Sequence, residues 1–269
     1  DDETEGEMII GSAGGVNMSA SLEYKPQETD ANDVAVKVTL HKLFGGHSGL
    51  EINEGRCNAN KAMARLVQDA IANFAACLSE WRGGNMRNAI PSSAEVILTL
   101  PKENVEAFKE VVAEWRQTFK DEYEPIEKTL ELDVEDVELP KHIVPAEIQD
   151  NLVDALCAVH NGVFRMIPEV PNIVETSSNL AIVNIGEGKA EFLILIRSSR
   201  DSMRECCAET LESAFAMAGM KVELSGEYPA WQPNPHSEIV ELMKGIYHEL
   251  FNEDSLVQVV HAGLECCVI

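Results

Sequence analysis

The chain has no run of about 18 apolar residues, so the sequence predicts no membrane-spanning helix. Basic residues are few: 21 Lys and Arg stand against 46 Asp and Glu, and the formal net charge is −25. Such a chain repels phosphates and anionic headgroups unless it carries a local basic patch. The composition therefore argues against a nucleic-acid-binding protein and against a partner of anionic membranes. Apolar residues still occupy 45% of the 269 positions, which is enough for a folded core.

The seven cysteines lack the pattern of a disulfide framework. Their number is odd, two pairs are vicinal, and most of them lie in apolar segments. No Cys-x-x-Cys pair occurs, so a cysteine-based zinc site is not expected. The plain interpretation is reduced thiols in a cytoplasmic protein. The chain also begins without Met and stops on an apolar run, so we expect both ends to be cut from a longer protein.

The order of predicted elements favours an α+β fold, with helices on a mostly antiparallel sheet. Apolar residues alternate with polar ones over 34–40, and they recur every three or four residues over 58–74, which predicts a strand and then an amphipathic helix. The glycines at 11–15 predict a turn, and 130–139 is a linker or an edge strand. No internal repeat is evident. We predict further helices over 103–127, 146–160, 202–217 and 236–251, and strands over 8–10, 94–100, 180–185, 191–197, 222–225 and 256–261.

Two local patterns could carry chemistry. His47 lies in Gly-Gly-His-Ser-Gly at 45–49, where small residues let the backbone approach a ligand and the imidazole can stabilise developing negative charge. The local sequence favours the simpler interpretation, which is a turn that happens to contain His. Arg197 ends the most apolar strand of the chain, where a buried guanidinium needs an anionic partner. That partner is either a structural carboxylate or a substrate carboxylate.

Three other patterns are weaker on their own. Asn88 precedes a proline and could present its amide to a carbonyl, or it could be an ordinary turn residue. His261 and Glu265 flank Gly263 at the end of a predicted strand, where ligands often bind in α/β folds. The acidic start at 1–7 could bind a cation, although charge runs are more often solvated faces.

Taken in order along the chain, the motifs resemble those of the cytosolic aminoacyl-histidine dipeptidases. These enzymes belong to the clan of dinuclear zinc aminopeptidases and dipeptidases. The resemblance spans essentially the whole chain, and 102–144 matches least. The motifs that carry it are the acidic start at 1–7, Gly-Ser-Ala-Gly-Gly at 11–15, Gly-Gly-His-Ser-Gly at 45–49, Asn-Ala-Asn-Lys at 58–61, Arg-Asn-Ala-Ile-Pro at 87–91, Asn-Gly-Val at 161–163, Val-Glu-Thr-Ser at 174–177, Ile-Arg-Ser at 196–198, Tyr-Pro-Ala-Trp-Gln-Pro at 228–233 and His-Ala-Gly-Leu-Glu-Cys at 261–266.

The resemblance implies a lid and dimerisation domain inserted into a catalytic domain that holds two zinc ions. On this chain 18–226 would be the lid, and 1–17 and 227–269 would be pieces of a truncated catalytic domain. The family pattern places one zinc ligand at Asp1, with Asp2 as the alternative register. Cobalt or manganese often substitutes for zinc in such sites. The other ligands would lie beyond both ends, so we expect this segment alone to be inactive.

The resemblance also implies roles for five residues. His47 would reach the active site of the partner subunit in a homodimer and stabilise the tetrahedral oxyanion. Asn88 and Arg197 would bind the substrate backbone and its C-terminal carboxylate, and Glu265 with Gly263 would form a wall of the pocket.

Three functions follow for comparison. The first is metal-dependent hydrolysis of dipeptides, of the Xaa-His type found in carnosine, by the full-length cytoplasmic protein. The second is a non-catalytic dimerisation or regulatory lobe. The third is a carboxypeptidase or amidohydrolase of the same clan. The long lid and the motifs at Asn88 and Arg197 favour the dipeptidase.

Overall fold

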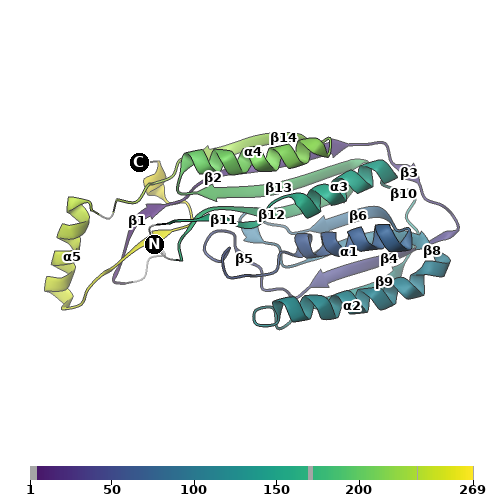
Figure 1. Ribbon diagram of the computed structural model, residues 1–269, viewed down its shortest axis with the longest axis horizontal. Coiled ribbons are helices and arrows are strands. Elements are labelled where there is room, and N and C mark those ends of the chain that lie inside the picture. The colour runs from purple at the N-terminus through teal and green to yellow at the C-terminus, as the bar shows by residue number, and fades with distance from the viewer. Residues whose placement is uncertain (1–4, 169–171, 235, 269) are drawn as a thin grey trace.

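The computed structural model describes residues 5–168, 172–234 and 236–268. Within them the main feature is a nine-stranded antiparallel sheet, in the order β14-β2-β13-β12-β6-β8-β4-β9, with β11 beside β12 (Figure 1). Its strands are β2 (Gly14–Glu23), β4 (Asp33–His41), β6 (Cys77–Gly83), β8 (Ala94–Pro101), β9 (Glu131–Val137), β11 (Gly162–Met166), β12 (Val174–Gly186), β13 (Lys189–Ser198) and β14 (Lys221–Tyr228). The predicted α+β fold with a mostly antiparallel sheet is confirmed.

Four helices lie side by side on one face of this sheet, in the order α4, α3, α1, α2 (Figure 1). The core lies between these two layers, because each helix turns an apolar stripe towards the sheet. Asn58 caps α1 by accepting hydrogen bonds from the backbone N–H groups of Asn60 and Lys61. The helices are α1 (Ala59–Phe74), α2 (Val105–Tyr123), α3 (Ala146–Ala158) and α4 (Asp201–Met217).

The two halves of the sheet share one connectivity. We call the half made of β4, α1, β6, β8, α2 and β9 the inserted unit, because it lies in the chain between β2 and α3 of the other half. We call the half made of β2, α3, β12, β13, α4 and β14 the enclosing unit. The strands are ordered β6-β8-β4-β9 in one and β12-β13-β2-β14 in the other. A structural repeat is therefore present where the sequence shows none, because apolar patterning can specify a fold without recurrence of particular residues.

The remaining elements lie at the two ends of the sheet. β1 (Glu7–Ser12) pairs in parallel with β15 (Leu256–Val260), apart from the main sheet. The short strands β5 (Gly46–His47) and β7 (Ala89–Ile90) pair with each other, as do β3 (Gln27–Glu28) and β10 (His142–Ile143). Two 3-10 turns, η1 (Lys102–Asn104) and η2 (Glu265–Cys267), complete the elements. The boundaries at 17 and 226 stay a prediction.

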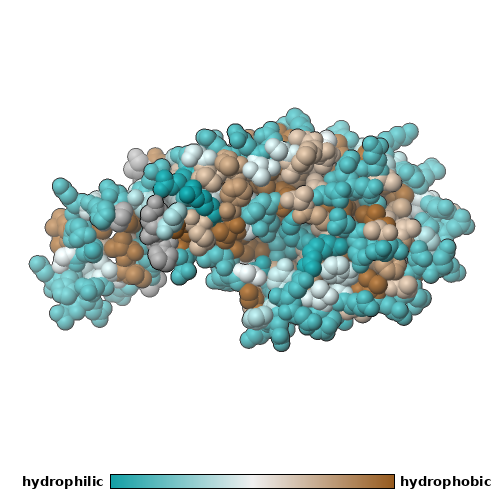
Figure 2. Space-filling model, in the orientation of Figure 1, coloured by the Kyte–Doolittle hydropathy of each residue, from teal (hydrophilic) through white to brown (hydrophobic). Residues whose placement is uncertain are grey.

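The helix α5 (Glu238–Phe251) projects at the left of the molecule, away from the sheet (Figure 1). Figure 2 shows apolar side chains on this projecting part, and Ile239, Leu242, Ile246 and Leu250 are about half exposed or more. Among the described residues, none of the helices combines the length and the apolar character that crossing a bilayer requires.

Some local predictions were wrong. The glycines at 11–15 do not form a turn, because Gly14 and Gly15 begin β2 and their missing side chains make room for the segment around Tyr228. The strands β2, β6 and β11 were not predicted. The second predicted helix ends at Tyr123 instead of 127, because Pro125 has no backbone N–H with which to continue the helical hydrogen bonds. For 130–139 the edge-strand alternative is confirmed by β9.

Candidate functional site

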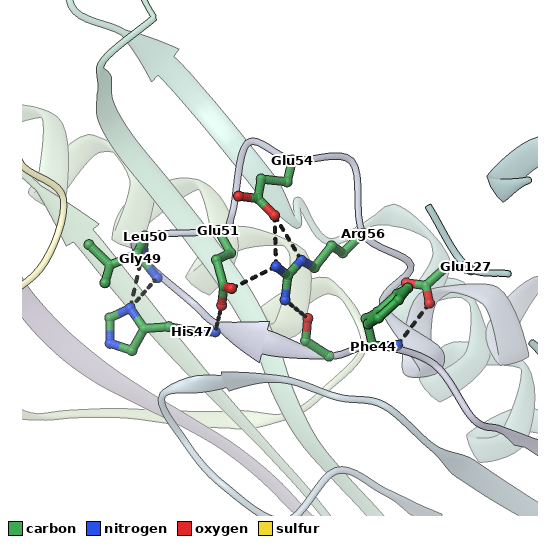
Figure 3. A network of polar contacts seen from close by, with 9 residues as sticks. Phe44, His47, Gly49, Leu50, Glu51, Glu54, Arg56 and Glu127 are labelled. Atoms are coloured by element: carbon green, nitrogen blue, oxygen red, sulfur yellow. Dashed lines mark hydrogen bonds and ion pairs between the residues drawn. The ribbon is translucent and has the colours of Figure 1, made fainter. Parts of the chain in front are cut away.

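The His47 loop is the segment 44–57 between β4 and α1, and one buried carboxylate holds both of its ends. Glu127 is 2% exposed. Its Oε2 accepts a hydrogen bond from the backbone N–H of Phe44 at 2.8 Å (Figure 3). Its Oε1 accepts one from the N–H of Cys57 at 3.0 Å. Hydrogen bonds to a charged acceptor are stronger than neutral ones, so Glu127 fixes the base of the loop. Sequence reasoning missed this residue, since nothing local marks a glutamate as buried.

An ion pair inside the loop holds its tip. Glu51 accepts a hydrogen bond from the backbone N–H of His47 at 2.5 Å and another from Nη2 of Arg56 at 2.6 Å (Figure 3). Arg56 in turn donates through Nη1 to the carbonyl of Gly45 at 2.8 Å. The tip is therefore bonded to its own base, which leaves the imidazole of His47 in a fixed position.

The hydrogen bonds of His47 define its tautomer. Its Nδ1 accepts from the backbone N–H groups of Gly49 at 3.2 Å and Leu50 at 3.1 Å, so the ring proton of the neutral imidazole lies on Nε2. Burial, and next the charge of Arg197, lower the pKa of His47. The ring is therefore neutral near pH 7, and its Nε2–H is a donor directed towards the site.

Arg197 is a buried cation without a carboxylate partner in the part of the chain that the structure describes. It lies near the end of β13 and is 5% exposed. It donates through Nη1 to the hydroxyl of Tyr228 at 3.1 Å and through Nε to Oγ of Ser48 at 3.5 Å. Burial lowers the pKa of Arg197, which reflects the cost of keeping this charge out of water. The described residues thus offer neutral partners and leave the charge uncompensated.

The two donors meet at one pocket. Nη2 of Arg197 lies 3.5 Å from Nε2 of His47, and because both atoms carry protons, this is an approach of two donors and not a bond between them. The pocket has a volume of about 420 Å³. Its lining consists of His47, Arg197, Tyr228, Ala262, Gly263, Leu264, Glu265, Cys267 and Val268. The structure therefore places His47, Arg197, Gly263 and Glu265 on one pocket.

Tyr228 is the pocket residue that sequence reasoning did not single out. Its ring fits between two backbones, because a Cβ on Gly15 would lie 2.6 Å from its hydroxyl and a Cβ on Gly263 would lie 2.8 Å from its Cε2. Both contacts are closer than real Cβ atoms allow, so each position needs glycine. The only signal in the sequence was the motif around Tyr228 itself.

His261 attaches the C-terminal segment to the sheet beside the pocket. It is 7% exposed, and its Nε2 lies 2.7 Å from Oγ of Ser177 on β12. A Cβ on Gly49 would lie 2.0 Å from the carbonyl oxygen of His261, so the His47 loop packs directly on this segment. Burial, followed by the charges of Arg197 and His47, lowers the pKa of His261 to about 3. The imidazole is therefore neutral and acts in packing.

The other predicted residues lie elsewhere. Asn88 is exposed and does not line the pocket, although its backbone carbonyl accepts a hydrogen bond from the N–H of Ser48 at 2.9 Å. Asp1 and Asp2 lie outside the described residues. Within 5–168, 172–234 and 236–268 no three His, Cys, Asp or Glu side chains are grouped so that they could hold a metal ion. The described residues by themselves do not fit a zinc site.

The structure shows the position of His47 within its own chain, and its contact with a partner subunit stays a prediction. We expected it to reach the active site of a partner subunit. In the structure it lies against Arg197 and lines the pocket of its own chain. Arg197 of the same chain lies beside His47 because the enclosing unit, which the sequence did not reveal, continues the sheet next to the inserted unit.

Comparisons with known proteins agree with this fold. Residues 38–127 match the family model described as a peptidase dimerisation domain. The chain is 35% identical over 266 residues to the cytosol non-specific dipeptidase of Escherichia coli, which covers 99% of this chain and 55% of that protein. The crystal structure of aminoacylhistidine dipeptidase from Vibrio alginolyticus matches with a TM-score of 0.95 and 36% identity, over 99% of this chain and 54% of that one.

The chain spans about half the length of these relatives. The matched family model coincides closely with the inserted unit, which begins at Asp33 and ends at Val137. Residues 38–127 are therefore similar to a peptidase dimerisation domain, and nearly the whole chain is similar to about half of a dipeptidase.

Proposed function

We propose that this chain is the substrate-binding part of a metal-dependent dipeptidase. Residues 18–226 form its lid, and 1–17 and 227–269 belong to its catalytic domain. The printed names of the two relatives, both dipeptidases, support the reaction class. The observation that carries the proposal is Arg197, a buried guanidinium whose partners among the described residues are all uncharged.

The free carboxylate of a short peptide is the anion that this site lacks. A buried arginine that has no counter-charge gains most from a ligand carboxylate, which it can bind through two parallel hydrogen bonds. Ser48 and Tyr228 hold the guanidinium in place at the pocket, and its Nη2 lies next to His47. A clamp on the C-terminal carboxylate also measures length, because a longer peptide would place its charge elsewhere.

His47 is suited to stabilise the oxyanion of the same substrate. In a dipeptide the scissile carbonyl carbon and the carboxylate carbon are three bonds apart. Neighbouring donors, Nε2 of His47 and Nη2 of Arg197, are 3.5 Å apart and can serve these two groups at once. A neutral imidazole on a fixed loop donates to developing negative charge without reorganisation. Glu265 and Gly263 form the wall opposite these donors in our proposal.

The proposed metal is zinc, as two ions, with cobalt or manganese as substitutes. When bound, zinc would supply a water of lowered pKa for attack on the peptide bond. Asp1 is the proposed ligand from this chain, and the other ligands belong to the part of the relatives that this chain does not span.

The substrate class and assembly are proposed as follows. The preferred substrates are Xaa-His dipeptides such as carnosine, with broad dipeptide hydrolysis as the alternative, because one relative is named for aminoacylhistidine and the other is named non-specific. A cytoplasmic location follows the word cytosol in a relative's name, and a homodimer follows the dimerisation domain. Asn88 is proposed to approach the substrate backbone when the lid moves.

A substrate panel on the full-length, metal-loaded protein tests the proposal. We expect hydrolysis of carnosine and other dipeptides, weak hydrolysis of their C-terminal amides, and none of N-acyl amino acids. Arg197→Gln should raise KM for free dipeptides and erase the preference over amides. The matched control is Arg200→Gln, three residues away, since Arg200 is 52% exposed in its side chain and pairs with Glu175 at 3.3 Å. Equal cleavage of free and amidated dipeptides by the wild type would contradict the carboxylate clamp.

A further inference from the structure

We propose that the inserted unit and the enclosing unit form an internal dimer, in which the His47 loop of one completes the Arg197 site of the other within a single chain. Each chain then holds one complete binding site, whatever its oligomeric state. For its activity readout this inference rests on the proposed function, whereas its spectroscopic readout does not.

The two units have the same topology. Both units follow the order strand, helix, strand, strand, helix, strand, and both arrange the strands in the same spatial sequence. They join through equivalent strands, β6 and β12, which are the second strand of each unit. Their helices next to the join, α1 and α3, are also equivalent and in contact. In a two-fold symmetric dimer, an element at the interface contacts the same element of the other copy. The pairs β6 with β12 and α1 with α3 follow this rule.

The pairing of β6 with β12 has the direction that two-fold symmetry requires. β6 and β12 run antiparallel, with Trp81 opposite Ile185, Arg82 opposite Asn184 and Gly83 opposite Val183. A two-fold axis perpendicular to the sheet relates two equivalent strands only when they are antiparallel, as they are here. The join therefore has the geometry of two copies meeting edge to edge, although one chain supplies both.

Buried hydrogen bonds make this join rigid. The side-chain amides of Asn58 and Asn60, at the start of α1 in the inserted unit, both donate to the carbonyl of Leu180 in the enclosing unit, at 3.1 and 3.5 Å. The side-chain amide of Asn179 donates in the other direction, to the carbonyl of Ala89 at 2.7 Å. Breaking the join would leave these buried polar groups without partners, which opposes separation of the units.

The site lies across the join. His47 and Ser48 belong to the inserted unit, and Arg197 belongs to the enclosing unit. The contacts between them, at 3.5 Å from Nε2 of His47 and at 3.5 Å from Oγ of Ser48, are contacts between units. In a dimer of two single units these contacts would connect different chains. Here the fold makes them within one.

A second pocket, of about 260 Å³, lies at the opposite end of the join. It is lined by Tyr24 after the first strand of the enclosing unit and by Glu80 on the second strand of the inserted unit. β6 and β12 carry a bulge at the same place in their pairing with β8 and β13, and with the two bulges matched Arg197 corresponds to Pro101. The buried guanidinium therefore occurs at one end only, which predicts one carboxylate site per chain.

Paired variants in the full-length protein test this assignment through activity. Two differently tagged copies are co-expressed, and the mixed dimer that carries both tags is purified. With His47→Gln in one copy and Arg197→Gln in the other, we expect no activity above that of the single variants. With both substitutions in one copy and a wild-type partner, we expect about half of the wild-type activity, because one of two sites is intact. The reverse result in the two dimers would overturn the internal dimer.

If no mixed dimer forms, the activity of the monomeric wild-type protein is measured instead. Activity of the monomeric wild type on dipeptides then supports the proposal, and activity confined to a self-associated form contradicts it. A wild-type protein with no activity on any dipeptide would refute the proposed function and leave the internal dimer to the spectroscopic test.

The spectroscopic test uses the pKa of His47 in the full-length protein. Burial first and the Arg197 charge second lower this pKa, so Arg197→Gln should raise it. Isotope-labelled Arg197→Gln protein is titrated by histidine NMR alone and in a mixed dimer, or a mixture, with unlabelled wild type. We expect the raised pKa in both samples, because the labelled chain lacks the arginine next to its own His47. A return of the labelled His47 to the wild-type pKa in the mixed sample would show that Arg197 comes from the other copy.

Discussion

Glu127→Gln removes the charge that fixes both ends of the His47 loop, without changing the size of the side chain. The carboxylate accepts two backbone hydrogen bonds, from Phe44 at 2.8 Å and Cys57 at 3.0 Å, and it is almost fully buried. A glutamine keeps one acceptor oxygen and presents an NH₂ group to the other backbone N–H. One bond is therefore lost and one buried donor is left unpaired.

The expected cost follows from these two contacts. A hydrogen bond to a charged group contributes about 1.5–3 kcal/mol, and replacement of one of the two predicts a loss of about 2–3 kcal/mol of unfolding free energy. For a chain of this size that corresponds to a fall in Tm of roughly 5–10 °C. Urea and thermal unfolding, followed by circular dichroism, measure both quantities. Hydrogen exchange at the amides of Phe44 and Cys57 should accelerate in the variant.

The matched control is Glu124→Gln, three residues earlier and exposed. This substitution also removes one negative charge, and it should change the unfolding free energy by less than about 0.5 kcal/mol. If Glu127→Gln is as stable as this control, or if the two amides keep their protection, Glu127 does not hold the loop and this account of His47 is refuted.

Three other contacts predict measurable effects. Gly263→Ala places a Cβ against Tyr228 and should cost about 1–3 kcal/mol in urea unfolding. Lys61 donates to three carbonyls at the end of α3, at 2.7, 2.7 and 2.8 Å, so Lys61→Met should lower Tm whereas Lys109→Met, at an exposed ion pair, should not. His261 has a folded pKa of about 3, so the unfolded chain binds more protons between that value and its ordinary pKa, and stability falls as the pH drops through this window. His261→Gln should flatten that fall, by up to about 1.4 kcal/mol per pH unit in urea titrations.

The sequence predicted most elements because their periodicity is strong, and it missed others for identifiable reasons. β2 alternates Val16, Met18 and Ala20 on its buried face, but it begins with two glycines and its small residues weaken the pattern. β6 follows α1 closely and carries Trp81 at its centre, so it looked like the end of a helix. β2 belongs to the enclosing unit and β6 to the inserted unit. Because neither strand was predicted, the two units and their shared connectivity could not be recognised from the sequence.

The site was predicted in part. His47 and Arg197 stood out because a histidine among glycines and an arginine at the end of an apolar strand are unusual locally. Tyr228 and Glu127 act through contacts made far along the chain, with Arg197 and with both ends of the His47 loop. No local pattern encodes such contacts, and the same holds for the pairing of His47 with Arg197 in one chain.

Equilibrium binding tests the central claim most directly, which is that Arg197 binds the C-terminal carboxylate of a dipeptide. Calorimetry on the full-length protein with its metal removed compares a dipeptide with its C-terminal amide, in the wild type and in Arg197→Gln. We predict at least about tenfold tighter binding of the free dipeptide by the wild type, close to 1.4 kcal/mol, and no difference in the variant. Equal affinity of the wild type for the dipeptide and its amide would contradict the claim.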